Sequence, residues 1–351
     1  MQVYAQIVYE RGPQIGVGEG MNSSVFLAFD PRVRRQIAVK EIEKANFGND
    51  FDSYYREAEV MFAVEHPNTV PIQYVCDTAD KIGLAMPYFQ NGSLKPRIAD
   101  GPIQVRKFLK MAQGVLHGVA RIHRCGFLHF DLKPSNIFFT DSDEPMVADF
   151  GQSRRATAGT VRVPRMYKWG IPPEVWDTQV GTFESDIFQV GVLFYRSING
   201  DPVYQAQREA IQTDGDLRQK VMGGRFPDPK FFLPHVPKRL RTVVRKAIRS
   251  NPADRFRSAT DLANSLGRIS PKLDWQVIHL GGGAYQWRAP RPGKPDLEVE
   301  LTQDGGLTWE ARVWTGQGVG KRAKRPSEFW RSALSYSDAC RHLTAVFADL
   351  A

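Results

Sequence analysis

The sequence predicts an α+β protein in which a small β-rich lobe is followed by a larger helical lobe and a small α+β module. Three observations predict this order. The first 90 residues alternate short β-type runs with one helical stretch, an amphipathic helical spacing begins after Asn91-Gly92, and strand-like alternation returns after Pro271. With 351 residues, 42% of them apolar, the chain can form one large two-lobed domain or two domains.

The first lobe is predicted to be a small sheet with one helix. The segments 11–30 and 35–43 have the composition of strands, and the first contains a Gly-rich turn. Residues 52–64 follow a helical pattern, whereas 70–76 and 82–86 predict two further strands.

The second lobe is predicted to be mostly helical. Between residues 105 and 122 apolar side chains recur at i, i+3 and i+4, which is typical of a long amphipathic helix. Residues 186–198 form a strongly apolar segment, and 238–250 and 258–266 predict surface helices with Arg and Lys on their outer face.

The last part of the chain, from residue 272 to 351, is predicted to combine a β-hairpin with a closing helix. Apolar residues alternate with polar ones at 297–301 and again at 307–313, with a turn at 303–306 between them. Ser337 is expected to cap a helix whose apolar face includes Leu343 and Phe347. Five of the seven tryptophans fall in this module, and we expect most of them in its core: Trp275, Trp287, Trp309, Trp314 and Trp330.

Composition narrows the classes of protein. No run approaches the roughly 18 apolar residues of a membrane-spanning helix, and the start of the chain lacks the pattern of a secretory signal. Cys76, Cys125 and Cys340 show neither a disulfide framework nor metal-ligand spacing, so we expect a cytoplasmic protein without a membrane partner. The net charge of +9, and the basic run 321–326, fit a polyanion such as nucleic acid or simply a solvated surface.

Two features of the first lobe indicate a phosphate site. The segment from Gly18 to Val25 is rich in glycine, which lets the backbone fold tightly and turn its N–H groups toward phosphates, although such turns also connect ordinary hairpins. Lys40 follows the apolar residues 37–39. A buried lysine there is costly unless its charge is used, for instance to hold phosphates; the alternative is an edge-strand lysine that points to water.

The strongest signal is the run from His129 to Asn136, HFDLKPSN, followed thirteen residues later by Asp149-Phe150-Gly151. The run resembles the catalytic loop of serine/threonine kinases, in which a carboxylate orients the substrate hydroxyl and accepts its proton, and this resemblance implies that role for Asp131. Oxygen donors at Asn136 and Asp149 suit Mg²⁺, a hard cation that keeps part of its water shell.

In this order and spacing the motifs resemble those of the protein kinase family, serine/threonine type. Further matches are Pro172-Pro173-Glu174, Ser185-Asp186 with Gly191, and Arg255. The resemblance covers residues 11–268 and implies a bilobal protein-kinase fold, with an N-lobe at about 11–86, a hinge at 87–91 and a C-lobe at 92–268. Residues 272–351 resemble no family known to us, so docking onto the kinase, self-association and substrate capture remain open for this module.

The resemblance also implies a role for each matched residue. Asp131 would be the catalytic base, Lys133 would steady the transferred phosphate, and Glu57 would pair with Lys40. Asn136 and Asp149 would bind Mg²⁺, and Glu174 would pair with the buried Arg255. The residues expected to contact ATP are Gly18, Gly20, Ser23, Val25, Ala38, Lys40, Met86, Tyr88, Phe89 and Phe138.

Two departures from the family pattern bear on regulation and on the substrate. Phe130 stands where an arginine usually receives an activation-loop phosphate, so activity is expected not to need phosphorylation there. Tyr167 takes the place of a threonine near Asp131 and so departs from the serine/threonine pattern, whereas Lys133 favours Ser/Thr as the substrate hydroxyl. The expected dispensable hydroxyls are Ser153, Thr157 and Thr160. A dense basic stretch either is solvated or selects acidic substrates: Arg154, Arg155, Arg162, Arg165 and Lys168.

We therefore predict a serine/threonine kinase that uses Mg·ATP to phosphorylate a protein. A pseudokinase scaffold is the alternative, but such proteins commonly lose one of the residues that are all present here. In a third interpretation the C-terminal module binds nucleic acid through Lys321 to Arg325 and targets the kinase.

Overall fold

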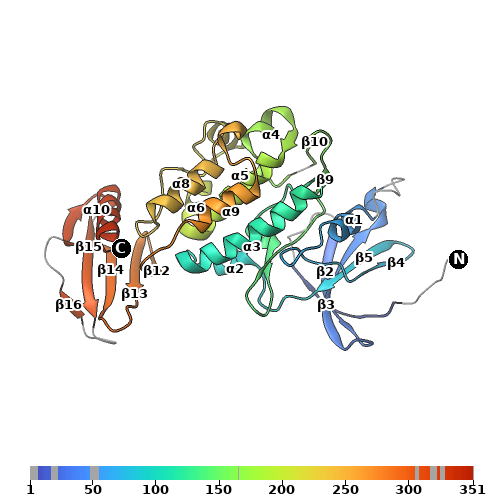
Figure 1. Ribbon diagram of the computed structural model, residues 1–351, viewed down its shortest axis with the longest axis horizontal. Coiled ribbons are helices and arrows are strands. Elements are labelled where there is room, and N and C mark those ends of the chain that lie inside the picture. Colours follow the sequence, from blue (N-terminus) through green and yellow to red (C-terminus); the bar gives the residue numbers. More distant parts are fainter. Residues whose placement is uncertain are drawn as a thin grey trace.

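The computed structural model describes residues 7–16, 23–47, 55–164, 166–304, 308–316, 322–324 and 329–350. Figure 1 shows three parts along the long axis of the molecule: an N-terminal sheet with one helix, a central helical lobe, and a C-terminal sheet with a helix. The predicted α+β class, with two lobes and a terminal module, is confirmed.

The N-lobe is a five-stranded antiparallel sheet in the order β1-β2-β3-β5-β4 with one α-helix beside it. The predicted strand 35–43 has these same bounds, and the predicted helix 52–64 is described from Arg56 onward. The expected strand 70–76 forms only from Tyr74, because the chain before it pairs with the C-lobe instead: the N–H of Val70 donates to Val147 O at 2.8 Å. The elements are β1 (Glu10–Ile15), β2 (Ser23–Asp30), β3 (Arg35–Glu43), η1 (Lys44–Phe47), α1 (Arg56–Ala63), β4 (Tyr74–Asp77) and β5 (Lys81–Pro87).

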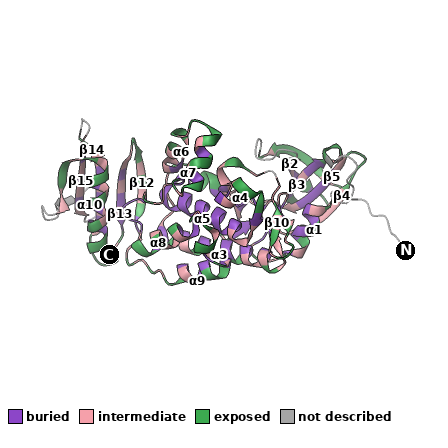
Figure 2. Cartoon of the chain, turned by 90° about the horizontal axis from the view of Figure 1, so that it is seen from above, coloured by how far each residue is buried: buried purple, intermediate pink, exposed green. Residues whose placement is uncertain are grey.

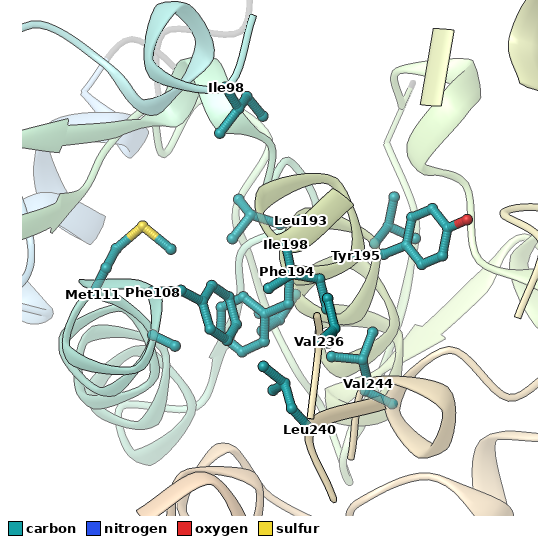
Figure 3. Close-up of a cluster of buried hydrophobic side chains, with 14 of the residues drawn as sticks. Ile98, Phe108, Met111, Leu193, Phe194, Tyr195, Ile198, Val236, Leu240 and Val244 are labelled. Carbon is teal, nitrogen blue, oxygen red and sulfur yellow. The ribbon is translucent and has the colours of Figure 1, made fainter. Parts of the chain in front are cut away.

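The C-lobe is built around two long helices, α3 (Val105–Arg124) and α5 (Phe183–Asn199). The first is the amphipathic helix predicted at 105–122, and the second contains the strongly apolar segment 186–198. Phe108 of α3 meets Phe194 of α5 edge-to-face with ring centroids 5.2 Å apart (Figure 3). Helix α5 is buried from Ser185 to its end, as the continuous purple in Figure 2 shows, and it starts with a capping box between Thr182 and Ser185. The other helices are α2 (Leu94–Arg97), α4 (Pro173–Thr178), α6 (Asp201–Glu209), α7 (Asp214–Met222), α8 (Lys238–Ala247), η5 (Pro252–Asp254) and α9 (Ala259–Gly267).

Short strands and turns of the C-lobe, between α3 and α5 in the chain, contain the predicted motifs. Strand β6 pairs with β9, β7 with β8, and β10 with β11, all antiparallel. These pairs fix the segments before and after the run His129 to Asn136. Their bounds are β6 (Phe127–Leu128), η3 (Pro134–Asn136), β7 (Ile137–Phe139), β8 (Pro145–Val147), β9 (Arg154–Arg155), β10 (Thr160–Arg162), η4 (Lys168–Gly170) and β11 (Val180–Thr182).

The C-terminal module is a larger sheet than expected, in the order β12-β13-β14-β15-β16 with β17 also paired to β15. The predicted hairpin is β14 and β15, whereas the other strands were not predicted. Ser335, not Ser337, caps the closing helix, because the Ser335 hydroxyl accepts the N–H of Asp338 at 3.1 Å and Ser337 lies within the first turn. The bounds are β12 (Gln276–Gly281), β13 (Ala284–Ala289), β14 (Asp296–Gln303), β15 (Trp309–Gly316), β16 (Arg322–Lys324), β17 (Arg331–Leu334) and α10 (Tyr336–Asp349).

The module packs directly on the C-lobe. The indole N–H of Trp287 donates to Nδ1 of His235, in the segment before α8, at 3.0 Å, and both rings lie against Phe347 of α10. Arg106 of α3 donates to the carbonyls of Pro271 and Lys272. Among the possibilities for the module, docking onto the preceding lobe is what the structure shows. The expected burial of tryptophans is confirmed for Trp275, Trp287 and Trp309.

Candidate active site

Lys40 connects three elements of the structure. Its Nζ lies 2.7 and 2.9 Å from the carboxylate oxygens of Glu57 on α1, and 2.8 Å from Oδ1 of Asp149. Lys40 is on β3, and its side chain is only 12% exposed. Glu57, rather than the exposed Glu59, is therefore the partner that the sequence analysis expected, and the alternative of a lysine pointing to water is wrong.

Burial and charge act in opposite directions on this group. Burial alone would lower the pKa of Lys40, but the nearby negative charges of Asp149 and Glu57 outweigh it and raise the pKa above its usual value. Burial would likewise raise the pKa of Asp149, but the charge and hydrogen bond of Lys40 lower it to about 2. Lysine and aspartate are therefore both ionised at neutral pH, as a site for phosphates and a cation requires.

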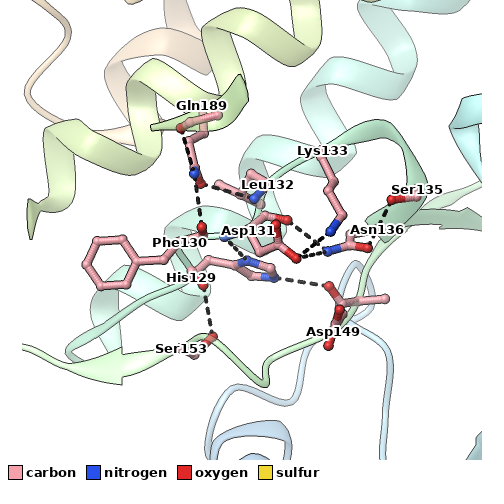
Figure 4. A network of polar contacts seen from close by, with 12 residues as sticks. His129, Phe130, Asp131, Leu132, Lys133, Ser135, Asn136, Asp149, Ser153 and Gln189 are labelled. Atoms are coloured by element: carbon pink, nitrogen blue, oxygen red, sulfur yellow. Dashed lines mark hydrogen bonds and ion pairs between the residues drawn. The ribbon is translucent and has the colours of Figure 1, made fainter. Parts of the chain in front are cut away.

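The segment from His129 to Asn136, here called the catalytic loop, forms a second group of contacts. Oδ2 of Asp131 accepts hydrogen bonds from Lys133 Nζ at 2.8 Å and from Asn136 Nδ2 at 2.9 Å. The same Asn136 amide also donates to the backbone carbonyl of Asp131. Figure 4 shows Asp149 beside this group, and the positive charge of Lys133 contributes to the low pKa of Asp149.

Helix α5 positions the catalytic loop through hydrogen bonds to the loop backbone. The fully buried carboxylate of Asp186 accepts the backbone N–H groups of His129 at 2.8 Å and Phe130 at 2.9 Å, and also a hydrogen bond from Nε2 of His123. Burial raises the pKa of Asp186, but the hydrogen bond and charge of His123 and His129 outweigh it and lower the pKa. The sequence analysis identified Asp186 but missed His123 and, three residues beyond Asp186, the buried Gln189.

Comparison with known proteins agrees with this geometry. The protein kinase domain family matches residues 9–265. The chain belongs to the protein kinase family. It is 26% identical to the serine/threonine-protein kinase PrkC of Bacillus subtilis over 257 residues, which are 70% of this chain and 38% of that protein.

Other kinases show similar likeness. Calcium-dependent protein kinase 12 of Arabidopsis thaliana is 27% identical over 68% of this chain and 49% of its own length. The serine/threonine-protein kinase PknK of Mycobacterium tuberculosis is 27% identical over 91% of this chain and 31% of its own length. The chain thus spans less than half of the length of these relatives. In the part of the chain that the structure describes, no helix is long and apolar enough to cross a membrane.

The residues that the kinase resemblance assigns to adenine lie on β2, β3 and β5 of the N-lobe, in the segment after β5, and on β7 of the C-lobe. The region around Lys40 and Asp149, where the two lobes meet, is here called the cleft. Ala38 of β3 pairs with Met86 of β5, and the rings of Phe89 and Phe138 are 5.9 Å apart. Val25 of β2 pairs with Lys40 in the same sheet. Ser23 opens β2 and Tyr88 follows β5, both half-buried, whereas Gly18 and Gly20 lie outside the described residues.

A buried ion pair supports the lower end of the kinase activation segment, residues 149–174. The two guanidinium nitrogens of Arg255 lie 2.9 and 2.6 Å from the carboxylate oxygens of Glu174, and the Arg255 side chain is fully buried. Ser185 also donates to Glu174 at 2.7 Å. The pairing predicted for Glu174 and Arg255 is therefore present.

The Phe130 side chain fills the place where the family usually has an arginine. Phe130 is completely buried, and its ring lies against Gly181 of β11. A Cβ atom at Gly181 would come within 2.3 Å of Phe130 Cε1 and 3.0 Å of Val163 Cγ2, so only glycine fits this contact. Strand β11 pairs with β10 of the activation segment, so the segment is connected through β11 to an apolar ring instead of to a charge that needs an anion.

The basic residues of the activation segment are used in different ways. Arg154 turns inward and donates to the carbonyls of Gly151 and Ser153, and Lys168 pairs with Asp214 at 2.9 Å. Arg155 and Arg162 are exposed. Arg165 lies outside the described residues, as do Lys321 and Arg325 of the basic run in the module.

Proposed function

We propose that this protein is an active serine/threonine kinase, which transfers the γ-phosphoryl group of Mg·ATP to a hydroxyl group of a protein substrate. The observation that carries the proposal is the bonding of Lys40 to both Glu57 and Asp149, next to the group Asp131, Lys133 and Asn136. A pseudokinase scaffold would not need all of these charged groups to be paired together.

The residues fit Mg²⁺ and ATP. Both amide hydrogens of Asn136 point to Asp131, so its Oδ1 is oriented away as a ligand, and among the described residues only a long contact from Ser135 reaches it at 3.4 Å. Together with the ionised Asp149 it offers the small oxygen donor set that Mg²⁺ takes when phosphates complete its shell. Bound there, Mg²⁺ supplies neutralisation of the charge that develops on the phosphates.

Each residue of the chain then has a distinct task. Lys40 binds the α- and β-phosphates, and Glu57 orients it. Asp131 orients the substrate hydroxyl and accepts its proton, and Lys133, already hydrogen-bonded to Asp131, balances the charge of the transferred phosphoryl group. Val25, Ala38, Met86, Tyr88, Phe89 and Phe138 surround the adenine.

The experiment is transfer of label from γ-labelled ATP to the protein itself and to casein as a general acceptor. Asp131→Ala should lower the rate by roughly 10²- to 10⁴-fold because proton transfer is lost. Asp149→Asn should abolish Mg²⁺-dependent labelling, whereas Asp141→Ala, at an exposed aspartate of the same lobe, should leave the rate unchanged. Labelling that persists in Asp149→Asn would contradict the proposal.

We further propose that phosphorylation of the activation segment is not required. The buried Phe130 ring lies against Gly181 of β11, which pairs with β10 of the activation segment, and Ser153 is 1% exposed, so a protein kinase cannot reach its hydroxyl in this conformation. Alanine at Ser153, Thr157 and Thr160 together should leave the rate of casein labelling within about twofold of wild type, because Thr157 and Thr160 are exposed and the buried Ser153 loses a long hydrogen bond, to the carbonyl of His129 at 3.5 Å. Loss of turnover in a folded triple variant would contradict this.

A preference for acidic substrates is favoured by Arg155 and Arg162. Both are exposed on the activation segment, and within the described residues neither forms an ion pair. Changing both to Gln should raise KM for an acidic peptide and reduce its salt dependence, while a neutral peptide is unaffected. Equal effects on both peptides would show that the two arginines are simply solvated.

A further inference from the structure

Gln189 joins two segments that meet at the substrate side of the catalytic loop. It projects from the middle of α5, is 3% exposed, and uses both ends of its amide. Oε1 accepts the N–H of Leu132 at 3.1 Å, and Nε2 donates to the carbonyls of Phe130 at 3.0 Å and Gly170 at 3.1 Å. Figure 4 shows the Gln189 side chain above Phe130 and Leu132, the residues that precede and follow Asp131 in the chain.

The backbone around Asp131 is fully accounted for only when Gln189 is included. Asp186 accepts the N–H groups of the two residues before Asp131, and the His129 ring accepts the N–H of Asp131 itself at 3.2 Å. Asn136 donates to the carbonyl of Asp131. The two remaining groups are the carbonyl of Phe130 and the N–H of Leu132, and Gln189 forms a hydrogen bond with each of them. Buried backbone groups without partners are costly, so this amide fixes the position of the loop.

The third hydrogen bond of Gln189 reaches the activation segment. Gly170 ends the short helix η4, next to Trp169 and Tyr167. The ring of Tyr167 faces Lys133, whose Nζ is 5.5 Å from the ring centroid. The Tyr167 residue is 41% exposed. This segment therefore borders the place where Lys133 and Asp131 would meet a substrate hydroxyl.

We propose that Gln189 is a positioning residue that sets the distance between the catalytic aspartate and the substrate-facing segment around Gly170. The proposal rests on the kinase function proposed above and adds to it the device by which the acceptor protein, rather than ATP, is aligned. One rigid amide bonded to both segments keeps them in register, and small displacements of reacting groups cost large factors in rate. Lys40, Glu57 and Asp149 do not contact it.

The test compares Gln189→Met with Gln207→Met. Methionine keeps the length and volume of glutamine but neither accepts nor donates these hydrogen bonds. Gln207 is a matched control in the same lobe, because its amide also bonds at both ends, to the Tyr195 hydroxyl and the N–H of Asp228, each at 2.8 Å. Both variants should lose comparable stability, which thermal unfolding measures. Gln189→Glu is a second variant that still accepts from Leu132 but places a negative charge against two carbonyls.

For Gln189→Met, kcat for casein phosphorylation should fall by about tenfold or more, with KM for casein raised, because the acceptor is misaligned. KM for ATP, and the slow hydrolysis of ATP by water, should change by less than about twofold, since the ATP-binding residues keep their contacts. Gln207→Met should leave all four values near wild type. If Gln189 had a purely structural role, kcat for casein phosphorylation would fall equally in both variants, or ATP hydrolysis would fall as much as casein phosphorylation in Gln189→Met. Either result would overturn the proposal.

Amide hydrogen exchange separates this proposal from the proposed function. In Gln189→Met the amide of Leu132 and those of residues 168–171 should both exchange faster than in Gln207→Met, whether or not the protein turns over ATP. A wild-type protein without activity would refute the kinase function, while the exchange result would still decide the coupling. Unchanged exchange in either of the two segments would show that Gln189 does not connect them.

Discussion

The cleft between the two lobes and the junction between the C-lobe and the module are built from opposite chemistry. In the cleft, charged side chains are held in place by opposite charges, as with Lys40 between Glu57 and Asp149. At the junction, the rings of Trp275, Trp287 and Phe347 pack together, and His235, whose ring lies beside Trp287 and Phe347, is held neutral because its pKa is low.

The difference indicates that the two contacts serve different ends. Ion pairs in a partly open cleft can be exchanged for contacts to phosphates, which are also charged, so the same residues bind and release a ligand. Buried aromatic side chains cannot replace their contacts with contacts to a charged ligand, and separating them exposes apolar surface to water. We therefore expect the cleft to determine turnover and the junction to determine stability, and the predictions below test this division.

The largest expected effect is at the junction. Trp287→Ala should destabilise the protein by about 3–5 kcal/mol, because the fully buried indole leaves a cavity next to His235 and Phe347. Trp287→Phe keeps much of the apolar volume and loses the hydrogen bond to His235, so its cost should be smaller, about 1–3 kcal/mol. Chemical denaturation with a tryptophan-independent signal, such as far-UV circular dichroism, measures both.

The outcome also tells whether the module is a separate unit. If the junction is part of one continuous core, Trp287→Ala lowers the midpoint for the whole protein in a single transition. Two unfolding transitions would contradict this if Trp287→Ala shifted only the one with the smaller amplitude and the denaturant concentration that halves casein phosphorylation stayed the same. That result would show that the module unfolds as a separate unit.

The second largest effect is expected from a substitution in the cleft, at Lys40. Lys40→Met should reduce phosphoryl transfer by roughly 10²- to 10³-fold, because a fixed charge next to the phosphates is lost. It should also destabilise the fold, since Glu57 is left buried without a cation. The double variant Lys40→Met with Glu57→Gln removes the unpaired charge, so stability should recover while activity does not. Recovery of activity together with stability would mean that Lys40 has only a structural role.

Sequence alone could predict the cleft better than the junction for a physical reason. Phosphoryl transfer needs particular residue types at particular spacings, so Lys40, Asp131, Asn136 and Asp149 could be recognised one by one. An aromatic contact needs only volume and apolarity, and nothing in the chain around His235 indicates that Trp287, 52 residues later, packs on it. The sequence accordingly left the docking of the module open.

Some missed features did have a signal. Gln189 is a polar residue inside the strongly apolar segment 186–198, and a buried amide there must be hydrogen-bonded. Ser335 stands three residues before Asp338, a spacing that favours it over Ser337 as a cap, although serines two residues apart are hard to distinguish by composition. Strands β12 and β13 also alternate between apolar and polar residues, with Tyr285, Trp287 and Ala289 buried, and the run of glycines from Gly281 to Gly283, which ends β12 and forms the turn, is a hairpin signal that the sequence analysis missed.

The smallest effect concerns pH at the junction. Burial, and to a lesser extent the charge of Arg241, lowers the pKa of His235 to about 3. The geometry agrees, because protonation would put a hydrogen on Nδ1, the atom that accepts from Trp287, while Nε2 has no partner in the described part of the chain. In the unfolded chain a histidine titrates near 6.5. Between these two pKa values the unfolded state binds the extra proton, so stability falls as pH decreases below about 6.5.

His235→Gln should remove this dependence while keeping an acceptor for the Trp287 indole. On going from pH 7.5 to 5.5, the wild type should lose about 1.4 kcal/mol more unfolding free energy than the variant, which is one pKa unit of protonation by the unfolded state. Urea titrations of both proteins at the two pH values measure it, and other histidines such as His129 cancel in the comparison. Equal losses would mean that His235 is protonated in the folded protein, and then the junction would contain a charge like those of the cleft.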